Sequence, residues 1–117
     1  MATIRLDGST LSTAEISLVS RGAKVEVATD AWCKVDAARA VVERILASGE
    51  TVYGINTGFG ALVSERIPPK DLAALQLTLI RSHACGIGES MSIQDTRAMM
   101  CVRANSLVKG HSGVRRV

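Results

Sequence analysis

Two long runs of apolar residues at helical spacing, each closed by a glycine, constrain most strongly how this chain can fold. Apolar positions recur three and four apart between residues 31 and 48, and Gly49 follows directly. The same spacing recurs between 94 and 109, and Gly110 follows. This spacing buries one face of a helix, and a glycine just past a helix readily takes the left-handed conformation that ends it. The pattern predicts a mainly α-helical protein.

Two short strands are expected near the N-terminus. Thr3–Leu6 has strand-like composition and is followed by the turn signal Asp7-Gly8. Val25 and Val27 flank Glu26 in the period-two alternation of a half-buried strand.

Two more helices are predicted by their start signals. Ser12 and Glu15 have the spacing of a capping box, which begins a brief helix that Gly22 stops. Pro68-Pro69 is expected to begin another helix, because proline is favoured in the first helical turn. The helix already predicted up to about residue 109 begins at Ser92 or Gln94. The helix after the prolines carries one apolar stripe, made of Leu72, Leu75, Leu79 and Ile80.

Composition and charge exclude several classes of function. Aromatic residues make up only 3% of the chain, and the net charge is +3 with the basic residues scattered except for Arg115-Arg116. Grooves for single-stranded nucleic acid need aromatic side chains for stacking, so we expect no nucleic-acid binding. No apolar run approaches the roughly 20 residues of a membrane helix, so we expect no membrane partner.

The cysteines and histidines predict neither disulfides nor a metal site. Three cysteines occur without a C-x-x-C pair, and the two histidines, His83 and His111, lie outside any H-E-x-x-H motif. The N-terminus has no signal-type apolar segment. These features predict a soluble, cytoplasmic protein with reduced thiols.

The segment 52–60 is unusual because it holds three glycines and two of the three aromatic residues, Tyr53 and Phe59. The third glycine of a dinucleotide fingerprint is missing, and so is the Gly-Lys-Ser/Thr ending of a phosphate loop. One interpretation is a plain surface loop. The other is a mobile active-site loop that presents Tyr53, which can act as a base near neutral pH only where positive charge or donors stabilise the phenolate.

A second unusual segment, Ser82-His-Ala-Cys-Gly-Ile-Gly88, places His83 at the end of a predicted helix. A histidine there is either a simple helix-capping residue or part of a site. Gly110-His-Ser-Gly113 lacks the last glycine of a nucleophile elbow and is interpreted as a helix stop followed by a turn.

Taken together, these segments resemble the aromatic amino acid lyase family, most closely its histidine-specific members. The resemblance rests on Tyr53-Gly-Ile-Asn-Thr-Gly-Phe-Gly60, Leu75-Gln76, Ser82–Gly88 and Arg103–Arg115, which occur in this order. It implies a helical fold, an elimination of ammonia from an aromatic amino acid, and a homotetramer several-fold longer than this chain.

The resemblance also implies an electrophile, methylidene-imidazolone (MIO), formed from an internal Ala-Ser-Gly beyond the Gly-His-Ser-Gly segment. The only Ala-Ser-Gly here, Ala47-Ser48-Gly49, precedes the tyrosine loop and is interpreted as a helix C-cap. Residues 1–117 are therefore expected to form the N-terminal domain of such an enzyme, without the MIO-forming segment and inactive alone. The apolar helix near the end of the chain and the lack of a closing element after Gly113 support this expectation.

The resemblance assigns roles to four residues. Tyr53 matches the base that removes the β-proton of the substrate, and His83 matches a position that lines the substrate side chain. Asn56 and Gly60 match loop and pocket-wall residues. Thr78 and Arg81 depart from the histidine-specific pattern and leave the substrate open.

The resulting hypothesis is an enzyme part that acts on L-histidine to give urocanate and ammonia. A tyrosine ammonia-lyase or 2,3-aminomutase is the alternative within the family. A non-catalytic helical interaction module is the alternative outside enzyme function.

Overall fold

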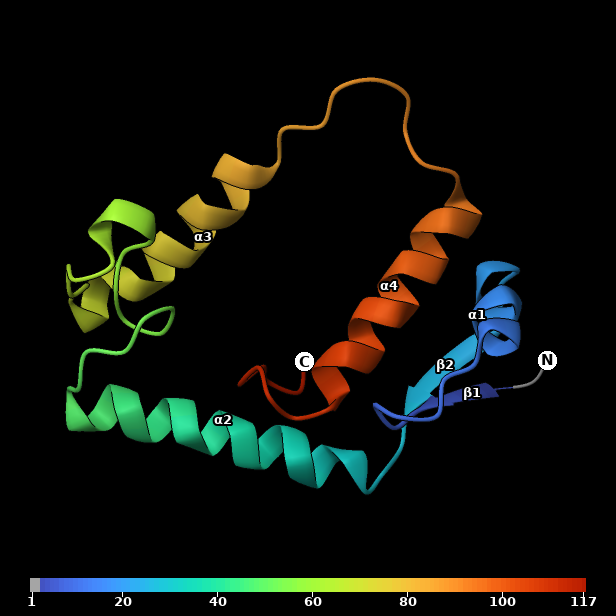
Figure 1. Ribbon diagram of the computed structural model, residues 1–117, viewed down its shortest axis with the longest axis horizontal. Coiled ribbons are helices and arrows are strands. Elements are labelled where there is room, and N and C mark those ends of the chain that lie inside the picture. Colours follow the sequence, from blue (N-terminus) through green and yellow to red (C-terminus); the bar gives the residue numbers. More distant parts are fainter. Residues whose placement is uncertain (1–2) are drawn as a thin grey trace. The chain divides into compact units, whose positions relative to one another are not determined.

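The computed structural model describes residues 3–117 and confirms a mainly helical fold with two short strands near the N-terminus (Figure 1). A long irregular segment with two short 3₁₀ turns separates the second and third helices. The elements, in chain order, are β1 (Thr3–Leu6), α1 (Thr13–Ser20), β2 (Lys24–Val27), α2 (Ala31–Ser48), the 3₁₀ turns Gly60–Leu62 and Pro69–Asp71, α3 (Leu72–His83) and α4 (Ile93–Val108).

The chain forms two compact units. The first contains the described residues up to Val41 together with Ser90–Val117, and the second contains Val42–Glu89. The boundary falls inside α2, so this helix contributes residues to both units.

The first unit has the hydrophobic core. β1 and β2 pair in parallel, with Thr3 opposite Lys24 and Leu6 opposite Val27. Parallel strands need a crossover connection, which α1 provides, and α1 packs against α4 (Figure 1). The buried side chains that form this core are Ile4, Leu6, Val19, Ala31, Cys101 and Val108.

The predicted helix starts in this unit are confirmed. Ser12 Oγ accepts a hydrogen bond from the Glu15 N–H at 3.3 Å, and the Glu15 carboxylate accepts one from the Ser12 N–H at 2.8 Å. These two bonds form the capping box. The bond from the Ser12 N–H, together with one that the Ser12 hydroxyl donates to the same carboxylate, lowers the pKa of Glu15. Ser92, rather than Gln94, caps α4, because its Oγ accepts a hydrogen bond from the Asp95 N–H at 3.0 Å.

The residues after α4 lie against the first half of α2. The Arg116 guanidinium forms a bidentate ion pair with the Asp36 carboxylate and lies 4.9 Å from the centre of the Trp32 ring. Gly110 has φ +80°, and a Cβ there would lie 2.7 Å from Lys34 backbone atoms. Glycine is therefore required where the chain turns after α4.

The second unit differs from the sequence prediction at α3. Pro69 begins a 3₁₀ turn, and the α-helix starts only at Leu72. Leu72, Leu75 and Leu79 are half-buried, but Ile80 is 67% exposed. The prediction that Ile80 shares their apolar stripe is therefore wrong. Successive helical residues are about 100° apart around the axis, so Ile80 lies on a different face from Leu79.

Within residues 3–117, no helix is both long and apolar enough to cross a membrane.

Candidate active-site loop

Asn56 organises the loop between α2 and α3 from the inside. Its side chain is 4% exposed; Oδ1 accepts a hydrogen bond from the Val52 N–H at 2.9 Å, and Nδ2 donates one to the Glu50 carbonyl at 2.6 Å. Its own carbonyl accepts a hydrogen bond from the Ile67 N–H at 2.9 Å, which ties the two ends of the loop together. An asparagine carries both the donor and the acceptor that this arrangement needs.

Thr57 and Gly58 continue this scaffold. Thr57 is 1% exposed, and its hydroxyl accepts a hydrogen bond from the Gly54 N–H at 3.4 Å and donates one to the Gly58 carbonyl at 2.8 Å. A Cβ on Gly58 would lie 2.7 Å from Leu62 Cβ and 2.8 Å from the Leu62 carbonyl oxygen. Glycine at position 58 therefore permits a close approach of two backbone segments.

Tyr53 projects from this scaffold. Its side chain is 60% exposed, and its ring meets that of Phe59 edge to face, with the ring centres 6.1 Å apart and the planes at 72°. Within residues 3–117 its hydroxyl has no hydrogen-bond partner. The loop thus holds the phenol outward while its polar backbone groups are satisfied inside.

Gly60 ends the motif and starts a 3₁₀ turn. Its φ is +59°, a conformation that glycine takes without strain. No heavy atom lies within 4 Å of the position that a Cβ would take, so the space beside Gly60 is open in the described structure. Its predicted role as a pocket wall stays a prediction.

His83 is the last residue of α3, as the sequence predicts, and its side chain is exposed. Nδ1 lies 2.8 Å from the Leu79 carbonyl and 3.1 Å from Ser82 Oγ. A carbonyl oxygen can only accept, so we assign the hydrogen to Nδ1. In the neutral ring Nε2 is then an acceptor.

The structure brings three of the four predicted site residues, Tyr53, Asn56 and Gly60, into one loop. His83 lies on another element of the same unit, and in the described part of the chain no hydrogen bond or ring contact joins it to that loop. Asn56 supports the loop through both ends of its side-chain amide, and its contact with a substrate stays a prediction.

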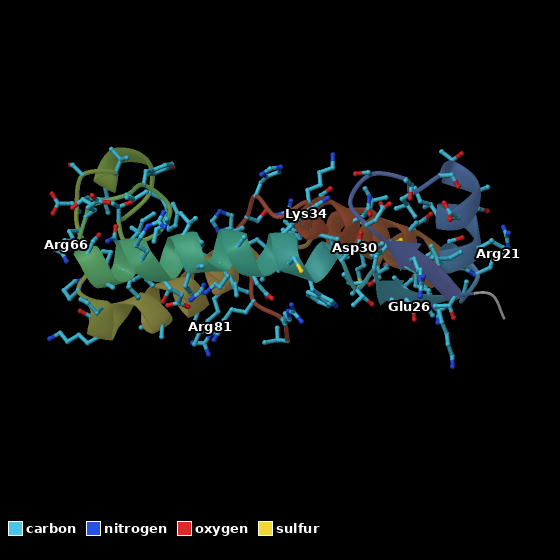
Figure 2. The ribbon with its side chains drawn as sticks, turned by 90° about the horizontal axis from the view of Figure 1, so that it is seen from below. Arg21, Glu26, Asp30, Lys34, Arg66 and Arg81 are labelled. Atoms are coloured by element: carbon cyan, nitrogen blue, oxygen red, sulfur yellow. The ribbon has the colours of Figure 1, made fainter. Side chains whose placement is uncertain are left out.

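Thr57 and Arg66 support the loop but were not predicted from the sequence. Both lie in the scaffold, where they form an isolated antiparallel bridge. The Arg66 side chain lies beside the C-terminal end of α2, with a guanidinium nitrogen 3.0 Å from the position that a Cβ on Gly49 would take (Figure 2). A hydroxyl side chain between Asn56 and Gly58 was the available sign that Thr57 supports the loop, whereas no local pattern marks Arg66.

A hollow of about 310 Å³ lies beside the loop and is lined by Leu46, Asn56, Arg66, Ile67, Pro69, Leu72 and Ala73.

Ala47-Ser48-Gly49 does not fit the formation of an MIO group. The Gly49 N–H donates a hydrogen bond to the Ile45 carbonyl at 3.2 Å, and Gly49 has φ +74°. Ser48 Oγ donates one to the same carbonyl at 3.1 Å. The tripeptide is the end of a helix, as predicted, and the Gly49 nitrogen is held by the helix hydrogen bond to the Ile45 carbonyl.

The remaining reactive side chains form no additional centre. Across the described residues, no three His, Cys, Asp or Glu side chains are grouped to hold a metal ion. Cys33 and Cys85 are exposed and Cys101 is buried, all as free thiols, and burial raises the pKa of Cys101. A buried thiol with a raised pKa is a poor nucleophile.

Comparison with known proteins decides the family. The family model described as aromatic amino acid lyase matches residues 11–117. This chain belongs to the aromatic amino acid lyase family. The resemblance carried by the Tyr53 loop, the His83 segment and Arg103–Arg115 is thereby confirmed.

Relatives within the lyase family include several histidine ammonia-lyases. That of Staphylococcus aureus (strain bovine RF122 / ET3-1) is 51% identical over 112 residues, which is 95% of this chain and 22% of the relative. The solved histidine ammonia-lyase of Trypanosoma cruzi is 42% identical, with a TM-score of 0.90 over 97% of this chain and 22% of that one. A tyrosine aminomutase from Streptomyces globisporus is 31% identical, with a TM-score of 0.91 over 97% of this chain and 22% of that one. The chain therefore spans about a fifth of the length of these relatives.

Proposed function

We propose that this chain is the N-terminal part of an ammonia-lyase that converts L-histidine to urocanate and ammonia. The observation that carries the proposal is the loop around Tyr53, whose buried amide and hydroxyl groups bond internally and leave the phenol exposed. A catalytic base must be held in place yet reach the substrate, and this arrangement provides both.

In the proposed reaction, the Tyr53 phenolate oxygen takes the β-proton of the substrate. The electron pair of the broken C–H bond forms the Cα–Cβ double bond, and the amino group leaves as ammonia. Departure of the amine needs the electrophile of the family, and Ala47-Ser48-Gly49 does not supply it. We therefore assign to these residues the proton transfer and the positioning of the substrate, and derive no step through the MIO group. The complete enzyme is proposed to be a cytoplasmic homotetramer.

His83 supports an imidazole substrate. With the hydrogen on Nδ1 directed at the Leu79 carbonyl, Nε2 can accept a hydrogen bond from the N–H of a substrate imidazole. A phenol O–H could donate to the same atom, so a tyrosine lyase or aminomutase is the alternative. Histidine is preferred because the relatives at about 50% identity are histidine ammonia-lyases, whereas the tyrosine aminomutase is 31% identical.

The decisive experiment is Tyr53→Phe in the complete enzyme that carries this sequence. The substitution keeps the ring and its contact with Phe59, so folding should survive. We expect kcat to fall about 10²–10⁴-fold, the usual contribution of a general base, with little change in KM. Urocanate absorbance measures the rate. Near-normal kcat in a folded variant would show that the phenol is not the base.

The substrate is tested by His83→Leu in the same enzyme. An apolar side chain leaves the polar edge of an imidazole unpaired, so kcat/KM for L-histidine should fall. The ratio of kcat/KM for L-phenylalanine to that for L-histidine should therefore rise. An unchanged ratio of the two values would remove His83 from the substrate site. If neither variant affects activity, the helical interaction module becomes the better description of this chain.

A further inference from the structure

The turn that carries Tyr53 has a defined form. The Ile55 N–H donates a hydrogen bond to the Val52 carbonyl at 3.1 Å, so Tyr53 and Gly54 are the two central residues of the turn. Gly54 has φ +79°, as the second central residue of a type II turn does. Types I and II differ by roughly half a revolution of the peptide group between the two central residues. The orientation of that peptide group therefore defines the turn.

Gly54 does not fix this orientation by itself. Glycine adopts positive and negative φ about equally well, so it is compatible with both turn types. No heavy atom lies within 4 Å of the position that a Cβ on Gly54 would take, so packing at this position does not favour either type in the described structure. Another group must select the orientation that is observed.

The Thr57 hydroxyl is the group that does so. Thr57 is 1% exposed, and its hydroxyl donates its one hydrogen to the Gly58 carbonyl at 2.8 Å. The oxygen can then only accept, and it accepts the Gly54 N–H at 3.4 Å. Half a revolution of the peptide would bring the Tyr53 carbonyl to the same place, because the N–H and the carbonyl of a trans peptide point in opposite directions. Two acceptors would then face each other at a buried position, which is unfavourable.

The direction of the phenol depends on this peptide. Its reversal changes ψ of Tyr53, and the rotamers open to a side chain depend on the φ and ψ of its residue. Among residues 3–117 the Tyr53 hydroxyl has no hydrogen-bond partner, and the ring meets only one other aromatic ring, that of Phe59. A side chain that is 60% exposed has few contacts to hold its direction once the backbone beneath it changes.

We propose that Thr57 is a positioning residue for proton abstraction. Its hydroxyl selects the type II orientation of the peptide between Tyr53 and Gly54 and thereby directs the phenol toward the β-carbon of the substrate. This inference rests on the proposed function of Tyr53 as the base. Thr57 acts through Tyr53 and needs no contact with the substrate, so its loss should lower kcat rather than raise KM.

The test compares variants of the complete enzyme that carries this sequence. Thr57→Val keeps the branched shape and removes the hydroxyl, whereas Thr57→Ser keeps the hydroxyl and removes a methyl group. We expect Thr57→Val to lower kcat by about 10- to 100-fold with little change in KM for L-histidine, because a displacement of about 1 Å can cost a reaction that much. Thr57→Ser should restore kcat to near the parent value. Thr51→Val is the matched control, because Thr51 is exposed and precedes the turn, and its kcat should be unchanged.

Two readouts separate positioning from mere support of the fold. A purely structural role would lower the melting temperature or the yield of folded enzyme and leave kcat per folded enzyme unchanged. Hydrogen exchange reports on the turn without reference to activity, and the Gly54 amide should exchange faster in Thr57→Val than in Thr57→Ser.

A second pair of variants tests the same peptide at an exposed residue, so it remains informative if Thr57→Val does not fold. Gly54→Ala should fold, because the space beside Gly54 is open, but alanine disfavours φ +79°. Gly54→Asn adds a larger side chain that tolerates positive φ. We expect kcat to fall further in Gly54→Ala than in Gly54→Asn. The opposite order would indicate a steric clash with the substrate and would contradict the proposal.

A double variant distinguishes this inference from the proposed function. Thr57→Val should have no further effect on kcat in a Tyr53→Phe background, because the group that it positions is already absent. If Tyr53→Phe lowers kcat but folded Thr57→Val does not, the positioning role alone is wrong. Equal losses in Thr57→Val and Thr57→Ser, or a further loss in the Tyr53→Phe background, would also overturn it. Near-normal kcat in Tyr53→Phe would overturn the proposed function and this inference with it.

Discussion

Asn56 and Tyr53 lie in the same loop but have different roles, one structural and one proposed to be chemical. Asn56 is buried and bonded at both ends of its side chain, whereas Tyr53 is exposed and contacts the loop only through its ring. The side chain that maintains the loop is therefore separate from the side chain proposed for proton transfer. Substitutions at the two positions should have different consequences.

Asn56→Ala should loosen the loop without unfolding the first unit. It leaves the Val52 N–H and the Glu50 carbonyl without partners, and each unpaired group costs about 1–3 kcal/mol where it stays buried. Hydrogen exchange at Val52 should accelerate markedly. Asn105→Ala is the matched control, because Asn105 Oδ1 accepts the Gly8 N–H at 2.9 Å in the other unit. Unchanged exchange at Val52 in Asn56→Ala would contradict the assigned role.

Asp7 should titrate unusually low. Its carboxylate accepts hydrogen bonds from the Thr10 and Ser9 N–H groups and from the Thr10 hydroxyl, which lower its pKa from 3.8 to about 2. A lowered pKa in the folded state stabilises the fold above about pH 4, and this contribution disappears as pH falls through about 2. Carboxyl NMR titration measures the midpoint. Thr10→Val removes only the hydroxyl bond and should raise the pKa part of the way; no change would contradict this account.

At the scale of elements, start and stop signals decide where the helices lie. The Ser12 capping box, the Ser92 cap and the glycines at 22, 49 and 110, all with positive φ, delimit α1, α2 and α4. These are local interactions, so they can be read from a few neighbouring residues.

Removing a cap should therefore have a measurable cost. Ser12→Ala should destabilise the first unit by about 0.5–2 kcal/mol, toward the low end because the cap bond to the Glu15 N–H is 3.3 Å long. Urea unfolding followed by circular dichroism measures this change. Ser9→Ala is the control: Ser9 bonds Asp7 through its backbone, so its side chain should matter little. Equal stabilities of the two variants would count against the capping box.

The contact between the final residues and α2 can be followed by fluorescence. Trp32 is the only tryptophan, and the Arg116 guanidinium lies over its ring. Arg116→Ala should expose the ring, shift its emission to longer wavelength and increase quenching by acrylamide. Arg115→Ala is the neighbouring control and should leave the emission unchanged. A spectrum of Arg116→Ala identical to the parent's would show that the segment does not lie against α2 in solution.

At the scale of the whole molecule, this chain should be unable to catalyse the proposed reaction alone. Its only Ala-Ser-Gly is held in a helix end by the bond from Gly49 N–H to the Ile45 carbonyl. Incubation with L-histidine should produce no urocanate above the buffer rate, while intact Staphylococcus aureus histidine ammonia-lyase serves as the positive control. Sustained turnover by these 117 residues would contradict both the assignment of the tripeptide and the proposed mechanism.

The sequence by itself determined most of the elements, because periodicity, caps and glycine stops act within a few residues of one another. Its ordered motifs, among them the loop that carries Tyr53, carried the resemblance to the family. Only the tertiary structure decided that β1 and β2 pair in parallel, that Asn56 and Thr57 are buried, and that Ile80 is exposed. It also decided that Arg66 lies beside Gly49 and that an open, mostly apolar hollow forms where α1, β2 and α4 meet. These features depend on contacts between residues far apart in the chain, and burial is a property of what packs against a side chain rather than of the side chain itself.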